Sequence, residues 1–285
     1  MRSITPTSRR LPGAAISLTA YDYPGTEPPI LFCHCTGVCA RVWEPVIAHL
    51  SIDNRVIAPD ARGHGDSDKP RVGAAYTWRG FAEDLLAVTD ALNLPDGTLA
   101  VGHSGGASAI VYAELMAPGR FSRVVLIDAI IAPPEFFPTA LPLAERSRRR
   151  RERFDSPHAA RQRLGNKPPM ENWAPEALDA YIEHGFTTCE DGAVTIKCPG
   201  EIEAYVYEFG GAISLYDRLA DMRAEALVVT GEDSYMAAHA HHQHSHLPNA
   251  QLITLPDTGH FIPQEKPRET AAIISEWFAS GGQSA

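Results

Sequence analysis

The first feature of this sequence that suggests chemistry is a serine between glycines, Ser104, in the stretch LAVGHSGGASA at residues 99–109. Apolar residues typical of a buried strand precede it, and small residues typical of a helix follow it. A strand, a tight turn and a helix together lift a serine hydroxyl clear of a sheet, and Gly102 and Gly106 leave room for that turn. The N-terminus of the following helix favours developing negative charge. This spacing predicts that Ser104 is a nucleophile.

His260 is the predicted base for this serine, because a serine hydroxyl is a poor nucleophile until a neighbouring group takes its proton. It lies in LPDTGHFIPQEKP at residues 255–267, between the last predicted strand and the last predicted helix. That position lets His260 reach the same edge of a sheet as Ser104. A Ser–His pair predicts attack on a carbonyl through an acyl-enzyme.

The elements that position these residues alternate between strand-like and helix-like segments, which is typical of a mostly parallel sheet with helices on its faces. Alternation of polar and apolar residues at 16–23 predicts a half-buried strand, and Thr77 is the predicted N-cap of a long amphipathic helix. Further strands are predicted within 28–35, 54–60, 97–104, 121–129, 225–233 and 250–258, and helices within 40–50, 77–94, 104–117 and 268–279.

Between residues 130 and 214 this alternation stops, and the chain becomes rich in proline, arginine and aromatic residues. We interpret this segment as a mainly helical cap inserted into a core formed by residues 1–129 and 215–285. The arginine run at residues 146–154 is interpreted as a solvated helix face.

Four separated motifs show that the chain resembles the α/β-hydrolase superfamily over nearly its whole length. They are HCTG (34–37), PDARGHGDSDKP (59–70), GHSGG (102–106) and GHFIP (259–263). The resemblance implies an α/β-hydrolase fold and a capped serine hydrolase of the esterase type. A serine nucleophile distinguishes the sequence from the epoxide hydrolases and haloalkane dehalogenases, which resemble it in layout and use an aspartate.

The resemblance also implies an oxyanion hole, which needs two N–H donors aimed at the developing charge. One is the backbone N–H of Gly105, the residue after the nucleophile. By the match to the family's His-Gly motif, the other is the N–H of Thr36. Cys35 stands where the family has glycine, so we expect its side chain to narrow the pocket or to change the backbone angles of the loop.

Two carboxylates are candidates for the acid of the triad. In most members of the superfamily the acid lies three residues after the glycine here numbered Gly231, but that position is Ser234 and Asp233 is one residue early. Some members carry the acid at the end of an earlier strand, and Asp128 in VVLIDAIIAPP fits that pattern. We favour Asp128 and keep Asp233 as the alternative.

Other residues have predicted roles near the site. The resemblance implies that Asp60, Asp66 and Asp68 are structural. Cys35 and several aromatic residues are candidates to line a substrate pocket between core and cap; the aromatic candidates are Trp43, Phe136, Phe137, Trp173, Tyr205 and Tyr207.

Composition limits the classes of partner. A net charge of −10 argues against a nucleic-acid surface and against binding to anionic membranes. The N-terminal residues include no apolar stretch of a secretory signal, and the five cysteines do not suggest a disulfide framework. We therefore expect a cytoplasmic protein with a small-molecule substrate; the oligomeric state is left open.

No metal or other cofactor is implied. The cysteines at 33, 35 and 39 with His34 match no zinc spacing. The histidines of AHAHHQHSH at residues 238–246 predict a polar, exposed helix, in which His242 and His246 share a face.

The sequence therefore predicts a serine hydrolase that cleaves an ester, thioester or lactone with Ser104 and His260. A carbon–carbon bond hydrolase acting on a β-diketone or a ring-cleavage product would use the same triad. A non-catalytic small-molecule receptor is a third possibility on the same fold.

Overall fold

Eight strands form one sheet in the computed structural model, which describes residues 5–212 and 214–280. Their order is β1-β2-β4-β3-β5-β6-β10-β11. The pairs β1–β2 and β2–β4 are antiparallel and the others are parallel, so the predicted mostly parallel sheet is confirmed. The strands are β1 (Thr7–Pro12), β2 (Ser17–Tyr23), β3 (Thr26–Cys33), β4 (Asn54–Pro59), β5 (Thr98–His103), β6 (Phe121–Ile127), β10 (Glu225–Gly231) and β11 (Ala250–Leu255). Residues 1–4, 213 and 281–285 of the predicted core and cap lie outside this description.

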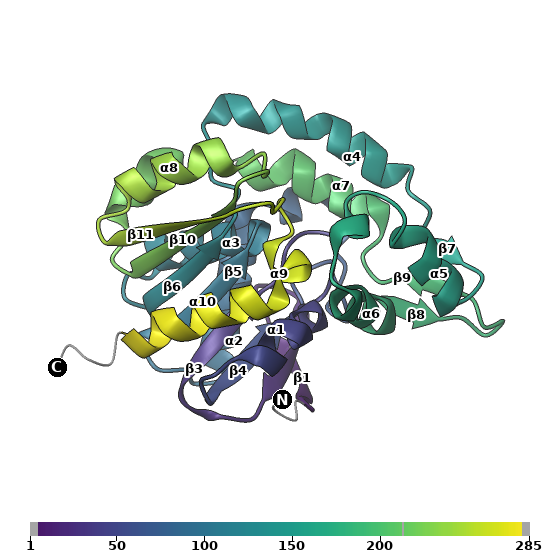
Figure 1. Ribbon diagram of the computed structural model, residues 1–285, viewed down its shortest axis with the longest axis horizontal. Coiled ribbons are helices and arrows are strands. Elements are labelled where there is room, and N and C mark those ends of the chain that lie inside the picture. Colours follow the sequence, from purple (N-terminus) through teal and green to yellow (C-terminus); the bar gives the residue numbers. More distant parts are fainter. Residues whose placement is uncertain (1–4, 213, 281–285) are drawn as a thin grey trace.

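Helices cover both faces of the sheet (Figure 1). Leu85, Ile110 and Ala240 bring three helices into the apolar cluster on one face, and Ile47 and Ile274 bring two into the cluster on the other. The first three helices are α2 (Trp78–Ala91), α3 (Gly105–Met116) and α8 (Ala237–His246), and the other two are α1 (Glu44–His49) and α10 (Pro267–Ser280); the short α9 (Ile262–Glu265) precedes α10. As predicted, Thr77 caps α2 and accepts a hydrogen bond from Gly80 N–H at 3.2 Å.

The first two strands differ from the prediction. β1 was not expected, because nearly all of its residues are exposed and show no apolar alternation. It pairs with β2, so β2 is an internal strand and not an edge, and all but the first of its residues are buried. The expectation of a half-buried strand at 16–23 is therefore wrong.

The chain between β6 and β10 forms a separate group of elements that Figure 1 shows beside and above the sheet. It contains α4 (Leu141–Arg148), α5 (Pro157–Leu164), α6 (Pro175–His184) and α7 (Gly200–Phe209), with the small antiparallel sheet β7 (Arg153–Phe154), β9 (Val194–Ile196) and β8 (Phe186–Thr188). Its apolar residues pack on the segment that follows β3, where Trp173 and Tyr181 share a cluster with Cys35 and Val42.

The arginine run does not form one solvated helix face, because α4 ends at Arg148. Arg148 makes a two-point contact with Glu208, at 2.6 and 2.8 Å, and Arg150 lies 2.5 Å from Glu203. The carboxylates of α7 therefore hold two of these arginines. Within residues 5–212 and 214–280, no helix has both the length and the apolar character that crossing a bilayer would require.

Candidate active site

Ser104 lies in the sharp turn between β5 and α3, with φ 57° and ψ −122°. The flanking glycines are needed for close approach: a Cβ on Gly106 would lie 2.4 Å from the carbonyl oxygen of Cys33, and one on Gly102 would lie 2.6 Å from the backbone nitrogen of Ala107. A non-glycine residue at such a φ is strained and persists where its surroundings hold it. Ser104 N–H donates to the carbonyl of Ile127 at 2.9 Å, which ties the turn to β6.

His260 follows β11 and lies between Ser104 and Asp128. Its Nε2 is 3.0 Å from Ser104 Oγ, and its Nδ1 is 2.5 Å from Asp128 Oδ2. A carboxylate only accepts, so Nδ1 carries the proton and Nε2 is free to accept from the serine hydroxyl. The structure thus brings three residues that are distant in sequence into one chain of hydrogen bonds.

Asp128 follows the end of β6 and is held in an unusual backbone conformation, with φ 46°. Its N–H donates to the carbonyl of Val229 at 2.8 Å. The side chain is fully buried, and its carboxylate accepts from Thr230 Oγ1 at 2.7 Å and from the hydroxyl of Ser234. Asp233 is exposed, and its backbone N–H donates to the carbonyl of Thr258 at 3.0 Å.

His103, the residue before Ser104, supports the loop that carries His260. Burial and the neighbouring His260 lower the pKa of His103 to about 3, so its ring is neutral. Its Nε2 lies 2.8 Å from the carbonyl oxygen of His260, and since a carbonyl only accepts, Nε2–H is the donor. The interaction fixes the backbone of the loop that carries His260.

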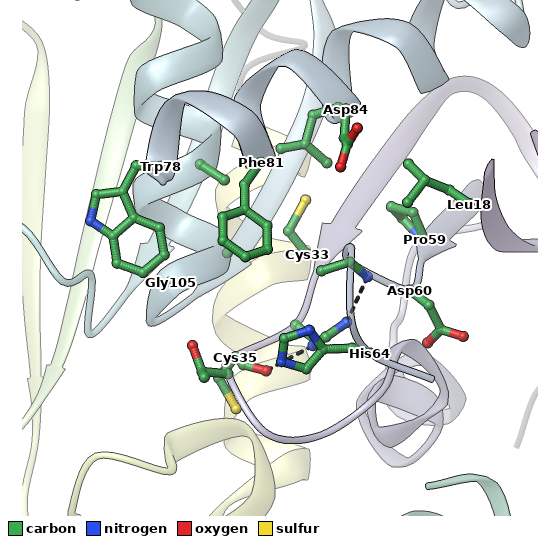
Figure 2. A pocket seen from close by; sticks show the side chains of 16 residues that line it. Leu18, Cys33, Cys35, Pro59, Asp60, His64, Trp78, Phe81, Asp84 and Gly105 are labelled. Carbon is green, nitrogen blue, oxygen red and sulfur yellow. Dashed lines mark hydrogen bonds between the residues drawn. The ribbon is translucent and has the colours of Figure 1, made fainter. Parts of the chain in front are cut away.

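The loop after β3 passes beside the start of α3. Thr36 Oγ1 lies 3.2 Å from the position that a Cβ on Gly105 would take. Gly105 is the first residue of α3, so its N–H has no acceptor within the helix. A cavity of about 40 Å³ adjoins this loop, and Thr36, Gly105, Trp78 and Phe81 contribute to its lining (Figure 2).

The backbone conformation at Cys35 is not one that favours glycine. Positive φ values among the described non-glycine residues occur elsewhere, at Ala15, Asn93, Ser104, Asp128 and Asp257. Cys35 is therefore outside the left-handed region, and the expected effect of its side chain on the pocket and the loop stays a prediction. Burial raises the pKa of the Cys35 thiol, so the side chain is a neutral group in the loop and not a nucleophile.

The segment from β6 to β10 contributes a buried acid beside this loop. Glu203 on α7 has Oε1 3.1 Å from the position that a Cβ on Gly37 would take. Tyr207 donates to the same oxygen at 3.1 Å, and Arg150 lies 2.5 Å from the other oxygen. These residues, apart from Tyr207, were not among the sequence candidates, because nothing in the local pattern shows that α7 faces Gly37.

The predicted pocket residues fall into two groups. Phe136 lies close to the site: its ring centroid is 6.5 Å from that of Tyr235, whose own is 4.7 Å from the ring of His260. Trp173 packs on Phe261, with ring centroids 5.4 Å apart.

Trp43 is not a pocket residue, because it is fully buried and packs edge-on against Phe32 in the core. Tyr205 stacks on Tyr76, with ring centroids 5.8 Å apart. The ring of Phe137 lies against the backbone of Gly211. Within the described part of the chain, none of these three side chains forms a hydrogen bond with Ser104.

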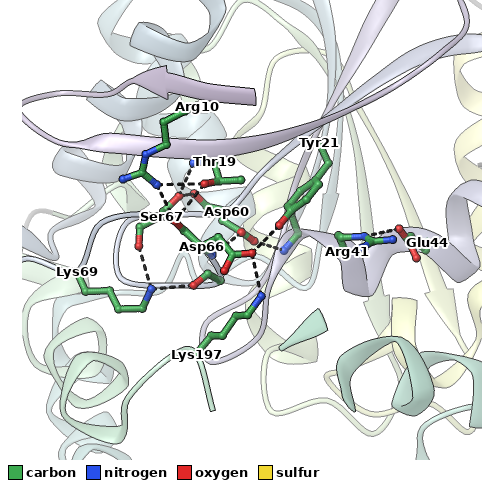
Figure 3. A network of polar contacts seen from close by, with 12 residues as sticks. Arg10, Thr19, Tyr21, Arg41, Glu44, Asp60, Asp66, Ser67, Lys69 and Lys197 are labelled. Carbon is green, nitrogen blue, oxygen red and sulfur yellow. Dashed lines mark hydrogen bonds and ion pairs between the residues drawn. The ribbon is translucent and has the colours of Figure 1, made fainter. Parts of the chain in front are cut away.

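The acidic residues after β4 form a structural network (Figure 3). Asp60 accepts from the N–H groups of Ala40 at 2.7 Å and Asp66 at 2.8 Å. Asp66 lies 2.8 Å from Lys197, and Asp68 accepts from Ser17 N–H at 2.8 Å. The structural interpretation of these aspartates agrees with the contacts they make.

The histidine-rich segment is helix α8, in which His242 and His246 stack with ring centroids 3.8 Å apart. Within residues 5–212 and 214–280, no group of three or more His, Cys, Asp or Glu side chains is placed to hold a metal ion.

Known proteins resemble this chain over most of its length. A model of the alpha/beta hydrolase family matches residues 30–273. The 2-(acetamidomethylene)succinate hydrolase of Mesorhizobium japonicum is 28% identical over 273 residues, which cover 95% of this chain and 94% of that protein. A crystal structure of E-2-(acetamidomethylene)succinate hydrolase has a TM-score of 0.84 at 26% identity, covering 96% of this chain and 100% of that one. A thermophilic esterase from Thermogutta terrifontis shares the fold, with a TM-score of 0.74 at 22% identity over 96% of this chain and 98% of that one.

Proposed function

This chain belongs to the alpha/beta hydrolase family, and from that premise we propose that it is a serine hydrolase of small carboxylic esters, thioesters or lactones. The observation that carries the proposal is the position of His260, with Nε2 3.0 Å from Ser104 Oγ and Nδ1 2.5 Å from Asp128 Oδ2. A nucleophile, a base within hydrogen-bond reach and a group that orients the base are the requirements of this chemistry. Residues 130–214 form the proposed cap over the site.

In the proposed reaction, His260 takes the proton of Ser104 as Oγ attacks the substrate carbonyl. Asp128 holds the Nδ1–H tautomer and stabilises the imidazolium that forms. His260 then gives the proton to the leaving alcohol, thiol or ring oxygen. Water, deprotonated by the same histidine, attacks the acyl-enzyme and releases the acid.

The tetrahedral intermediate carries a negative oxygen that the N–H groups of Thr36 and Gly105 are proposed to bind. Such donors contribute most when they are fixed before the reaction begins. Thr36 Oγ1 lies 3.2 Å from the Cβ position of Gly105, which supports the convergence of the two segments.

The charges beside the oxyanion loop favour an uncharged substrate. Arg150 is partly buried with Glu203 as its partner, at 2.5 Å, so the arginine is already neutralised. A substrate carboxylate placed there would meet Glu203 and be repelled. An ester or lactone avoids that cost.

A second candidate is hydrolysis of an amide such as 2-(acetamidomethylene)succinate. The observation that favours it is the similarity to the hydrolase of that name over 95% of this chain. The same serine chemistry applies to its acyl group, but the two carboxylates of that molecule would need cationic partners in the cap.

The test is hydrolysis by wild type and Ser104→Ala of a panel of short p-nitrophenyl esters, a lactone, a vinylogous β-diketone and 2-(acetamidomethylene)succinate. We expect ester or lactone turnover in the wild type and at least about a 10⁴-fold loss of kcat in Ser104→Ala. Ester turnover that survives in Ser104→Ala would contradict the acyl-enzyme mechanism. Turnover of the diketone or the succinate alone would transfer the assignment to those substrates, and binding without turnover would indicate a receptor.

A further inference from the structure

The loop that carries Thr36 is bound on its N-terminal side by a histidine. His34 Nε2 lies 3.0 Å from Ala61 N–H, which can only donate, so Nε2 accepts and Nδ1 carries the proton. His34 Nδ1–H then donates to the carbonyl of Cys35 at 2.7 Å. One neutral ring thus connects the residue before Thr36 to the loop after β4.

A second histidine binds the loop on the other side of Thr36. His64 Nε2 accepts from Gly37 N–H at 3.0 Å, so its proton is on Nδ1, which donates to the carbonyl of Arg62 at 2.9 Å. Burial, and secondarily the neighbouring His34, lower the pKa of His64 to about 3. The ring therefore stays neutral, and Nε2 keeps the lone pair that Gly37 needs.

A small cavity adjoins this loop, so packing around it is incomplete. The cavity of about 40 Å³ is lined by residues 33–36 on the loop side and by His64 (Figure 2). An empty space offers no contacts that resist displacement of the backbone. Directed hydrogen bonds therefore add to the packing of Cys35 in fixing the peptide groups beside Thr36. On the cap side, the hydroxyl of Tyr181 donates one to the Gly37 carbonyl at 3.2 Å.

The element that carries His64 is itself rigidly anchored. Asp60 accepts from the N–H groups of Ala40 and Asp66, and its carbonyl accepts from Ser67 Oγ at 2.6 Å (Figure 3). The network joins the loop after β4 to the end of the loop after β3. His64 therefore acts from a fixed support.

We propose that His64 is a positioning residue for catalysis: its Nε2 holds the Gly37 N–H and so directs the adjacent Thr36 N–H toward the oxyanion. The inference rests on the proposed function, because it assigns a role within that oxyanion hole. His64 touches neither the nucleophile nor the base, and it acts through the Gly37 peptide group. A displacement of this peptide would weaken stabilisation of the tetrahedral intermediate more than binding of the ground-state ester.

Two polar substitutions separate the two hydrogen bonds of His64. In His64→Gln the side-chain amide reaches the Nε2 position, so Gly37 N–H retains an acceptor. In His64→Asn the shorter amide reaches only the Nδ1 position, so it donates to the Arg62 carbonyl and leaves Gly37 N–H without its acceptor. Each variant thus keeps one of the two hydrogen bonds and loses the other, while both have a neutral amide in place of the imidazole.

The experiment measures kcat and KM for the best p-nitrophenyl ester, and inhibition by phenylboronic acid, which forms a tetrahedral adduct on a serine. We expect His64→Asn to lower kcat at least about tenfold, with KM within about threefold, and to weaken phenylboronate by a similar factor. His64→Gln should stay within about threefold of wild type in all three quantities.

The control is His184→Gln, which removes a histidine whose ion-pair partner is Glu44, at 3.2 Å, and not a residue of the oxyanion loop; it should leave kcat unchanged. Equal kcat values for His64→Asn and His64→Gln would overturn the inference, as would a comparable loss of kcat in the control. Ser104→Ala is measured in parallel. If it retains activity, the proposed function fails; if it is inactive while the two His64 variants are equal, only the role of His64 fails.

Discussion

The hydroxyl of Ser234 donates a hydrogen bond to Oδ2 of Asp128, the same oxygen that lies 2.5 Å from His260 Nδ1. Thr230 donates to the other carboxylate oxygen at 2.7 Å. A buried carboxylate is costly unless donors replace its hydration, and three side chains do so here. Ser234 occupies the position at which most members of the family carry the acid, and here it supports Asp128, the proposed acid, from a different strand.

This arrangement predicts different results for the two candidate acids. Asp128→Asn keeps the shape of the side chain but turns an amide N–H donor toward the Nδ1–H donor of His260, or forces the wrong tautomer, so kcat should fall about 10³- to 10⁴-fold. Asp233→Asn should stay within about twofold of wild type, because the side chain of Asp233 is exposed. Steady-state kinetics on one ester compares both variants directly.

Ser234→Ala serves as the intermediate case in that series, with the acid present but one of its donors removed. We expect about a three- to tenfold lower kcat from the loss of a single hydrogen bond to a charged group. A wild-type rate for Asp128→Asn, together with a large loss in Asp233→Asn, would reverse the assignment of the acid.

Ser104 and His260, the proposed nucleophile and base, could be identified in the sequence because each belongs to a short local motif. The turn around Ser104 needs small neighbours, and its strand and helix are visible in the apolar pattern on either side. His260 is identified by its place between the last strand and the last helix. Helix α2 was predicted to within a few residues for a similar reason, since Thr77 marks its start.

The partners of these residues were not predictable, because they depend on which segments meet in space. Thr230 and Ser234 approach Asp128 from more than 100 positions away, and nothing in their own sequence context indicates it. Trp43 was a pocket candidate within a segment of helical spacing, but its side chain is fully buried against the sheet. Strand β1 was not predicted because it has no apolar face; its pairing with β2 through the backbone stabilises it.

A buried ion pair joins helix α2 to the loop after β4 and should contribute strongly to the stability of the protein. Arg62 and Asp84 lie 2.7 Å apart with side chains only 7% and 4% exposed. Asp84→Ala would leave the guanidinium buried without its counter-charge, so we expect a loss of about 3–5 kcal/mol in the free energy of unfolding. Urea denaturation followed by circular dichroism measures this change.

The neighbouring pair on the same helix is a matched control. Arg79 and Glu83 lie 2.8 Å apart, but their side chains are 59% and 36% exposed. Water screens that pair, so Glu83→Ala should cause no measurable loss of stability.

The double variant Arg62→Leu/Asp84→Leu tests whether the buried pair acts as a unit. It should lose less free energy of unfolding than the sum of the losses in Arg62→Leu and Asp84→Leu, and strictly additive losses would show that the pair does not act as a unit.

The buried histidines predict that stability falls in mild acid. Burial is the main cause that lowers the pKa of both His64 and His103 from the ordinary 6.5 to about 3. Between these values the unfolded chain binds a proton that the folded chain excludes, so the contribution is fully present above pH 6.5 and is lost as the pH falls toward 3. Between pH 7 and pH 5, each ring should lower the free energy of unfolding by about 2 kcal/mol. The loss begins near the ordinary pKa of 6.5, about 1.5 units above pH 5, and amounts to about 1.4 kcal/mol per pH unit.

The free energy of unfolding measured in urea at pH 7 and pH 5 checks this prediction, with the His64 variant as the probe. His64→Gln removes one titrating ring, so its loss of stability between the two pH values should be about 2 kcal/mol smaller than that of the wild type, whatever its stability at pH 7. His241→Gln is the control: its side chain is exposed, so the difference between pH 7 and pH 5 should match that of the wild type. An identical pH dependence for wild type and His64→Gln would mean that the folded protein accepts a proton at His64 above pH 5. Gly37 N–H would then lose its acceptor in the same pH range, and the loop that carries Thr36 would loosen before the protein unfolds.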